Sequence, residues 1–125
     1  MIYLDTHVVA WLYAGMLERF PPLVRERLEG DLAISPLVEL ELQYLFEVGR
    51  TSVPADVVIS DLRQRIGLET SDASLVAVVE VARSLDWTRD PFDRLIAAQA
   101  LSDGLALLTA DKTIRAHLDL AVWES

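Results

Sequence analysis

Four acidic residues in this chain lie where apolar residues would be expected: Asp5, Glu41, Asp93 and Asp111. Asp5 and Asp111 each end an apolar run, whereas Glu41 and Asp93 fall within apolar helical patterns. A carboxylate in apolar surroundings must be paired, protonated or bound to a cation. Together, the four residues indicate a site for a divalent metal ion.

Glu41 has the most informative position of the four. With about 100° per residue on a helix, it lies within roughly 60° of five apolar residues: Leu37, Val38, Tyr44, Leu45 and Val48. Glu39, two residues earlier, points to the opposite side. The helical phase therefore predicts that Glu41 lies at the centre of the apolar stripe. The alternative is a glutamate at the end of the stripe that reaches water.

Asp93 repeats this pattern on a second predicted helix, where three apolar residues share its side: Ile96, Ala97 and Ala100. It also has a structural alternative. As the third residue after Asp90, it could complete a capping box at the start of the helix. Asp90 itself precedes a proline and is interpreted mainly as the N-cap, with a place in the site as its secondary possibility.

The two aspartates that follow apolar runs have the same structural alternative. Asp5 and Asp111 each precede a predicted helix, and aspartate is a favoured N-cap residue. Taken singly, either interpretation suits them. Taken together with Glu41 and Asp93, capping alone would require four independent coincidences, which favours the metal site.

Besides Asp90, three further residues are weighed as secondary participants: Thr6, Thr109 and Arg94. Thr6 and Thr109 could each add a hydroxyl or backbone oxygen ligand, although a turn or strand role fits them better. Arg94 follows Asp93 and could contact phosphate, a surface carboxylate or a partner protein. His7 has no acidic or serine partner at motif spacing, so we interpret it as a packed histidine at the start of a helix.

Composition restricts the chemistry further. The 125 residues are 52% hydrophobic, which suits one domain, residues 1–125, with its own core. The chain has no cysteine and only two histidines, so a metal ion would meet mainly oxygen ligands. The apolar stretches are far shorter than the roughly 20 residues that span a bilayer. Met1 leads directly into a predicted strand without a signal segment. We therefore expect a cytoplasmic protein without a membrane segment.

The charge of the chain needs a separate explanation. A net charge of -9 argues against a general nucleic-acid binder, which normally carries a basic face. A carboxylate cluster that binds a divalent cation and a basic partner protein would account for the excess. All cationic side chains but one lysine are arginine, which is well suited to bidentate contacts with phosphate or carboxylate.

Predicted strands and helices alternate along the chain. Short apolar segments predict strands at 2–4, 32–34, 68–70, 106–109 and 120–123. Periodic segments with proline or N-cap signals predict helices at 6–14, 22–28, 36–49, 54–67, 71–85, 91–104 and 112–117. This alternation predicts a parallel sheet covered on both faces, with ligands bound beyond the carboxyl ends of the strands. Asp5 and Asp111 both lie at such ends, but the sequence alone does not show that their strands are neighbours.

These residues and their spacing resemble the PIN domain and, more narrowly, the VapC ribonuclease toxins of bacterial toxin-antitoxin modules. The resemblance covers essentially the whole chain. It is carried by Leu4–His7, Glu41 six residues after Ser35, the segment Arg89–Ala100, and Leu107–Asp111. The Asp-Pro-Phe-Asp-Arg run at 90–94, with Asp111 following Asp93 by 18 residues, is its most specific part.

The resemblance implies an α/β fold, a three-layer αβα sandwich around a short, mainly parallel sheet. It also implies a magnesium- or manganese-dependent endoribonuclease that is the toxin of a type II toxin-antitoxin system. The site would consist of Asp5, Glu41, Asp93 and Asp111. Such proteins act on RNA, bind a cognate VapB-like antitoxin and form homodimers. The residue types agree, because carboxylates and substrate phosphate commonly hold magnesium, and no protein nucleophile is required.

Two other classes of function remain open at this point. A metal-dependent phosphatase or phosphotransfer domain of the haloacid dehalogenase type needs a second aspartate two residues after Asp5, where this chain has His7. A response-regulator receiver needs a strand-end lysine, whereas the only lysine, Lys112, follows Asp111. A catalytically silent PIN-like binding module would use its acidic residues only as caps. Divalent-ion binding separates that module from the nuclease.

Overall fold

Five short parallel strands form a single sheet in residues 1–124, the part of the chain that the computed structural model describes. The strands are β1 (Ile2–Leu4), β2 (Leu32–Ile34), β3 (Glu69–Thr70), β4 (Leu107–Leu108) and β5 (Ala121–Val122). Their order in the sheet is β3-β2-β1-β4-β5, and every neighbouring pair is parallel. The predicted parallel sheet is confirmed.

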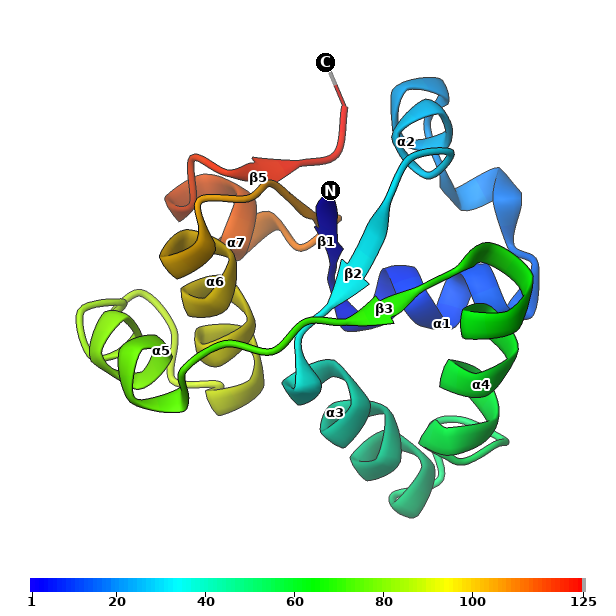
Figure 1. Ribbon diagram of the computed structural model, residues 1–125, viewed down its shortest axis with the longest axis horizontal. Helices are drawn as coiled ribbons and strands as arrows, with labels where there is room; N and C mark the ends of the chain where they lie inside the picture. Colours follow the sequence, from blue (N-terminus) through cyan, green and yellow to red (C-terminus); the bar gives the residue numbers. More distant parts are fainter. Residues whose placement is uncertain (125) are drawn as a thin grey trace.

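Helices flank this sheet on both sides. They are α1 (Thr6–Ala14), the 3-10 turn η1 (Leu17–Arg19), α2 (Pro22–Arg27), α3 (Pro36–Glu47), α4 (Ala55–Ile66), α5 (Leu75–Ala82), α6 (Pro91–Asp103) and α7 (Lys112–His117). In Figure 1, α5 and α6 lie to the left of the central strands, and α1 and α4 lie to the right. This is the predicted three-layer arrangement. The turn η1 was not predicted.

The central strand β1 determines where the two strand-end aspartates meet. All three of its residues are buried, because it is covered on both faces. It pairs with β4 through Tyr3 with Leu107 and Leu4 with Leu108. The pairing continues past the strand, where the Asp5 N–H donates to the Leu108 carbonyl at 3.0 Å. The two strands are therefore neighbours, and both aspartates follow the same edge of the sheet.

The helix predicted over residues 71–85 is wrong at its start. The structure begins α5 at Leu75, with the Ser74 hydroxyl accepting the Ala77 N–H at 3.3 Å. Ser71 is occupied elsewhere: its N–H donates to the Ile34 carbonyl at 2.8 Å, and its own carbonyl accepts from Gln99. The sheet edge and α6 therefore hold this residue in an extended segment, which local helix propensity does not anticipate.

Strand ends also differ slightly from the predicted ranges. The strands predicted at 106–109 and 120–123 are each reduced to two residues in β4 and β5. Their hydrogen bonding nevertheless extends one residue further, since the Thr109 N–H donates to the Val122 carbonyl at 3.1 Å. Within residues 1–124, no helix combines the length and the apolar character needed to cross a membrane.

Candidate metal centre

Three carboxylates converge beyond the carboxyl edge of the sheet. Asp5 follows β1, Glu41 lies on the second turn of α3, and Asp93 lies on the first turn of α6. One carboxylate oxygen from each can be chosen so that all three lie within 4.8 Å of one another. Asp5 is only 2% exposed, and the other two are half-buried. Residues that are distant in the sequence thus form one acidic cluster.

Hydrogen bonds hold Asp5 in a fixed orientation. Its Oδ1 accepts the Thr6 N–H at 2.8 Å, which caps α1. Its Oδ2 accepts the hydroxyl of the fully buried Thr109 at 2.7 Å. The Thr109 hydroxyl in turn accepts the Asp111 N–H at 3.1 Å. These two threonine contacts position Asp5, while the carboxylate retains lone pairs for a further ligand.

Within residues 1–124, the Glu41 carboxylate accepts one hydrogen bond. The hydroxyl of Thr6 donates to its Oε1, so Thr6 links Glu41 to the start of α1. Burial raises the pKa of Glu41, and the negative charges of Asp5 and Asp90 raise it further, against the effect of the Thr6 hydrogen bond. The ionised glutamate is therefore disfavoured unless a cation compensates for its charge.

The helical phase of α3 correctly separates Glu41 from Glu39, but it predicts the buried face of the helix only in part. Glu39 points away from the cluster, since its Oε2 accepts the Thr70 hydroxyl at 2.6 Å. However, Tyr44 and Val48 are 48% and 50% exposed, whereas Val38 is fully buried, so only part of the predicted apolar stripe is covered. Figure 1 shows the second half of α3 extending away from the sheet, where the Tyr44 ring still packs against Phe92 of α6 with centroids 5.8 Å apart.

Asp93 is the most strongly perturbed member of the cluster. Burial, followed by the charges of Asp5, Asp90, Asp111 and Glu41, raises its pKa from 3.8 to about 7. Within residues 1–124, its carboxylate accepts no hydrogen bond from the protein. The metal-free cluster therefore contains a carboxylate that readily retains a proton near neutral pH.

The capping box considered for Asp93 does not form. Asp90 caps α6 as predicted, with its Oδ1 accepting the N–H groups of Phe92 at 2.9 Å and Asp93 at 3.2 Å. In a capping box, the Asp93 carboxylate would accept the Asp90 N–H in return. That N–H instead donates to the Thr88 hydroxyl at 3.2 Å. The Asp93 side chain is therefore free to face the other carboxylates.

Asp111 lies beside the cluster rather than within its tightest group. Its Oδ1 accepts the Ile114 N–H at 2.9 Å and caps α7. Its charge still acts on Asp93, whose pKa it helps to raise. The structure thus brings all four predicted carboxylates to one edge of the sheet but unites only three of them as candidate ligands of one ion.

Arg94 has a contact that the sequence did not indicate. Its Nε donates to the Ala82 carbonyl at 2.7 Å, and one terminal nitrogen donates to the Arg83 carbonyl at 3.3 Å. The guanidinium therefore binds two carbonyls at the end of α5, and that of Ala82 also accepts the Leu85 N–H. This fixes the helix that carries Asp93 against α5, instead of directing the charge to phosphate.

The donor set suits a hard divalent cation. All candidate ligand atoms are carboxylate oxygens, the type that magnesium and manganese prefer. Burial and mutual repulsion disfavour the ionised forms of Glu41 and Asp93 in the absence of a cation. A bound cation would remove both penalties, so the residues present fit such an ion. With one, this edge of the sheet could activate water against a phosphodiester.

Comparisons with known proteins agree with this geometry. Ribonuclease VapC22 from Mycobacterium tuberculosis (strain ATCC 25618 / H37Rv) is 32% identical over 124 residues, covering 93% of this chain and 91% of that protein. The fold is similar to that in the crystal structure of VapBC2 from Rickettsia felis bound to a DNA fragment from their promoter. That match has a TM-score of 0.68 and 23% identity, and covers 99% of this chain and 98% of that one.

A second solved structure shares the fold at lower identity. A toxin-antitoxin complex from Klebsiella pneumoniae matches with a TM-score of 0.64 and 19% identity, over 98% of this chain and 96% of that one. The family model of the PIN domain matches residues 2–117, which include all four predicted site residues. The chain belongs to the PIN domain family.

Proposed function

We propose that this protein is a metal-dependent endoribonuclease and the toxin component of a type II toxin-antitoxin system. The observation that carries the proposal is the group of Asp5, Glu41 and Asp93, whose ligand atoms lie within 4.8 Å of one another. The identity to a ribonuclease of the VapC type supports the RNA substrate. We expect the protein to act in the cytoplasm, as its cysteine-free composition suggests.

We propose magnesium or manganese as the cofactor. Asp5, Glu41 and Asp93 would hold the ion, with Asp111 available at the edge of the group. When bound, the ion supplies a more acidic water and neutralises charge on the phosphate oxygens. The protein contributes an Asp5 carboxylate oriented by Thr6 and Thr109, and an Asp93 that gives up its proton on loading. No serine, cysteine or histidine nucleophile is needed for this hydrolysis.

The proposed protein partner is a VapB-like antitoxin. A groove of about 830 Å³ runs between α1 and the α3–α4 connection, with Trp11, Leu42 and Val53 among its lining residues. Apolar grooves of this kind accept the apolar face of a partner helix. The net charge of -9 would favour an antitoxin segment that is basic as well as apolar.

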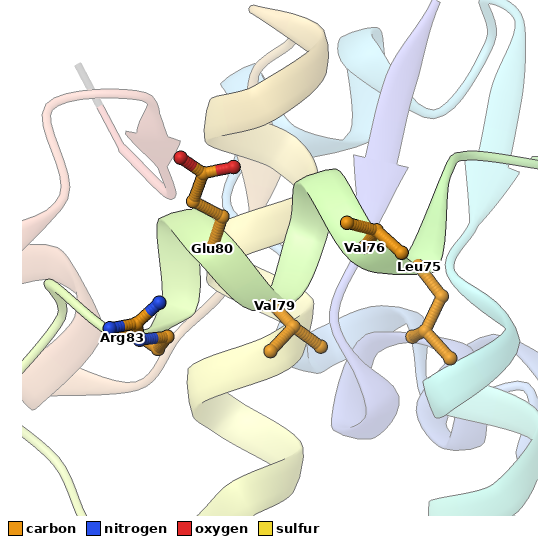
Figure 2. A pocket seen from close by; sticks show the side chains of 5 residues that line it. All are labelled: Leu75, Val76, Val79, Glu80 and Arg83. Atoms are coloured by element: carbon orange, nitrogen blue, oxygen red, sulfur yellow. The ribbon is translucent and has the colours of Figure 1, made fainter.

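The proposed homodimer has a candidate surface on α5. Leu75 and Val76 are 64% and 79% exposed there, beside Val79. Figure 2 shows these apolar side chains on the same helix as the charged Glu80 and Arg83. A two-fold axis places the same patch on both subunits. Glu80 of one subunit could then face Arg83 of the other, which makes the patch self-complementary.

The test of the nuclease uses purified, antitoxin-free protein with total cellular RNA. We expect cleavage with magnesium or manganese, and none in EDTA or with the Asp5→Ala variant. If the wild-type protein binds neither ion, the proposal fails and the silent binding module is favoured. If it binds an ion but hydrolyses only phosphomonoesters, the phosphatase alternative replaces the nuclease.

A further inference from the structure

His7 connects two parts of the candidate metal centre that lie far apart in the sequence. It is the second residue of α1, yet its Nε2 accepts the N–H of Ala110 at 2.9 Å. Ala110 lies between Thr109 and Asp111, in the turn that follows β4. The imidazole therefore bridges the start of α1 and the turn that carries Asp111.

The bond to Ala110 determines which ring nitrogen carries the proton in the neutral imidazole. A nitrogen that accepts an N–H must be unprotonated, so in neutral His7 the hydrogen lies on Nδ1. Nδ1 is 3.5 Å from Oδ2 of Asp5. This is longer than an ordinary N–H···O hydrogen bond of about 2.9 Å, so it is an electrostatic contact. Its donor nevertheless faces a carboxylate oxygen of the centre.

Packing keeps the imidazole in this orientation. Its ring centroid is 4.9 Å from that of Trp11 and 6.3 Å from that of Trp123. The His7 side chain is 29% exposed, so its surroundings cover most of it. With one nitrogen bonded to the backbone and its faces restrained, the ring has little freedom to turn Nδ1 away from Asp5.

We propose that His7 is a positioning residue for Asp5, in which the Nδ1–H restrains Oδ2 and the Ala110 bond aims the ring. Thr109 donates to the same oxygen, so two groups share the task of orienting this carboxylate. His7 acts through Asp5 and need not touch the ion or the RNA. The inference rests on the proposed metal-dependent function of the centre.

Two amide substitutions separate the two contacts of the ring. In His7→Asn, the amide nitrogen can take the place of Nδ1 and donate to Asp5, but the side chain is too short to reach Ala110. In His7→Gln, the amide oxygen can take the place of Nε2 and accept from Ala110, but no donor faces Asp5. The affinity of each full-length variant for Mn²⁺ is measured by titration calorimetry, beside the melting temperature of its metal-free form.

We expect His7→Gln to lose about tenfold or more in Mn²⁺ affinity, the usual effect of removing a group that orients a ligand, while it melts close to the wild type. His7→Asn should stay nearer to wild-type affinity. The proposal is overturned if His7→Gln binds Mn²⁺ within about twofold of the wild type. It is also overturned if His7→Asn binds more weakly than His7→Gln or does not fold, since a purely structural role through Ala110 predicts that order. Failure of the wild type to bind Mn²⁺ would instead refute the proposed function itself.

Discussion

Replacing Asp93 with asparagine should stabilise the metal-free protein while removing its response to metal. The substitution preserves the shape of the side chain but deletes the charge that burial and four neighbouring carboxylates oppose. Because the Asp93 carboxylate accepts no hydrogen bond from residues 1–124, the asparagine breaks none. Most substitutions in a folded protein are destabilising, so a gain in stability would be a specific consequence of the crowded charges.

The pKa of Asp93 gives the size and the pH dependence of this effect. Its rise from 3.8 to about 7 would correspond to roughly 4 kcal/mol if none of it were screened. Because Asp93 is only half-buried, solvent screening reduces the expected gain to about 1–2 kcal/mol. Between about pH 4 and 7 the folded state binds a proton that the unfolded state does not. The stability of the wild-type protein therefore falls as the pH rises through this range.

The assay is thermal unfolding in EDTA and in manganese, at about pH 8 and at about pH 5. At the higher pH, the Asp93→Asn variant should melt roughly 4–8 °C above the wild type in EDTA. At the lower pH this advantage should nearly vanish, because the wild-type carboxyl is then protonated. Manganese should raise the melting temperature of the wild type much more than that of the variant.

Asp119→Asn is a matched control, because Asp119 is exposed and lies outside the cluster. It should change the melting temperature little at either pH. The reasoning is refuted if Asp93→Asn is no more stable than the wild type at about pH 8. It is also refuted if the gain is the same at both pH values, because the effect would then not arise from the ionised carboxylate.

Four further outcomes are expected. Mn²⁺ affinity of the wild type, measured by calorimetry, should fall about tenfold between about pH 8 and pH 6, since Asp93 must release a proton to bind the ion; a flat profile would contradict this. Arg94→Ala should lower the free energy of unfolding in urea by about 1–3 kcal/mol, because the Ala82 and Arg83 carbonyls lose their hydrogen bonds to a charged guanidinium. Its Mn²⁺ affinity should change little. Thr109→Val should reduce RNA cleavage about 10- to 100-fold, with Thr109→Ser retaining most of the activity, because only the serine keeps the hydroxyl between Asp5 and Asp111. Val76→Asp should convert a dimer to a monomer in light scattering, whereas Asp119→Asn should not. If the wild-type protein is already monomeric, the proposed dimer surface on α5 is refuted.

Local sequence patterns predicted those parts of the fold that depend on local interactions. The apolar runs at 2–4 and 32–34 form β1 and β2 within the predicted bounds, and Ser35 caps α3 as its proline-flanked position indicates. The predicted start of α5 at Ser71 was wrong because hydrogen bonds to distant residues hold Ser71 in an extended segment. Ser71 bonds to the Ile34 carbonyl and accepts from Gln99, and neither partner is visible from local periodicity.

The same distinction applies to the candidate site. Asp5, Glu41 and Asp93 could be predicted because a carboxylate on an apolar helix face or strand end is anomalous in itself. The contact of His7 could not, because its partner is the backbone N–H of Ala110, a group that every residue except proline possesses. The contacts of Arg94 could not be predicted either, since its acceptors are backbone carbonyls. Contacts between a side chain and the backbone of a distant segment are difficult to predict from sequence, because the residue type of the partner does not indicate them.

Capping and metal binding turn out to be compatible roles for the strand-end aspartates. Asp5 and Asp111 each give one oxygen to the first turn of a helix, which leaves the rest of the carboxylate at the edge of the sheet. In a parallel α/β fold, helices begin where strands end, so an N-cap aspartate is placed at the ligand-binding edge by the same turn that it stabilises. Among the residues that the structure describes, Glu41 and Asp93 have no such backbone donors, and burial raises the pKa of both. The capped aspartates thus keep their orientation without a cation, whereas Glu41 and Asp93 gain most from its charge. Metal affinity should therefore be most sensitive to pH through these two helix-borne carboxylates.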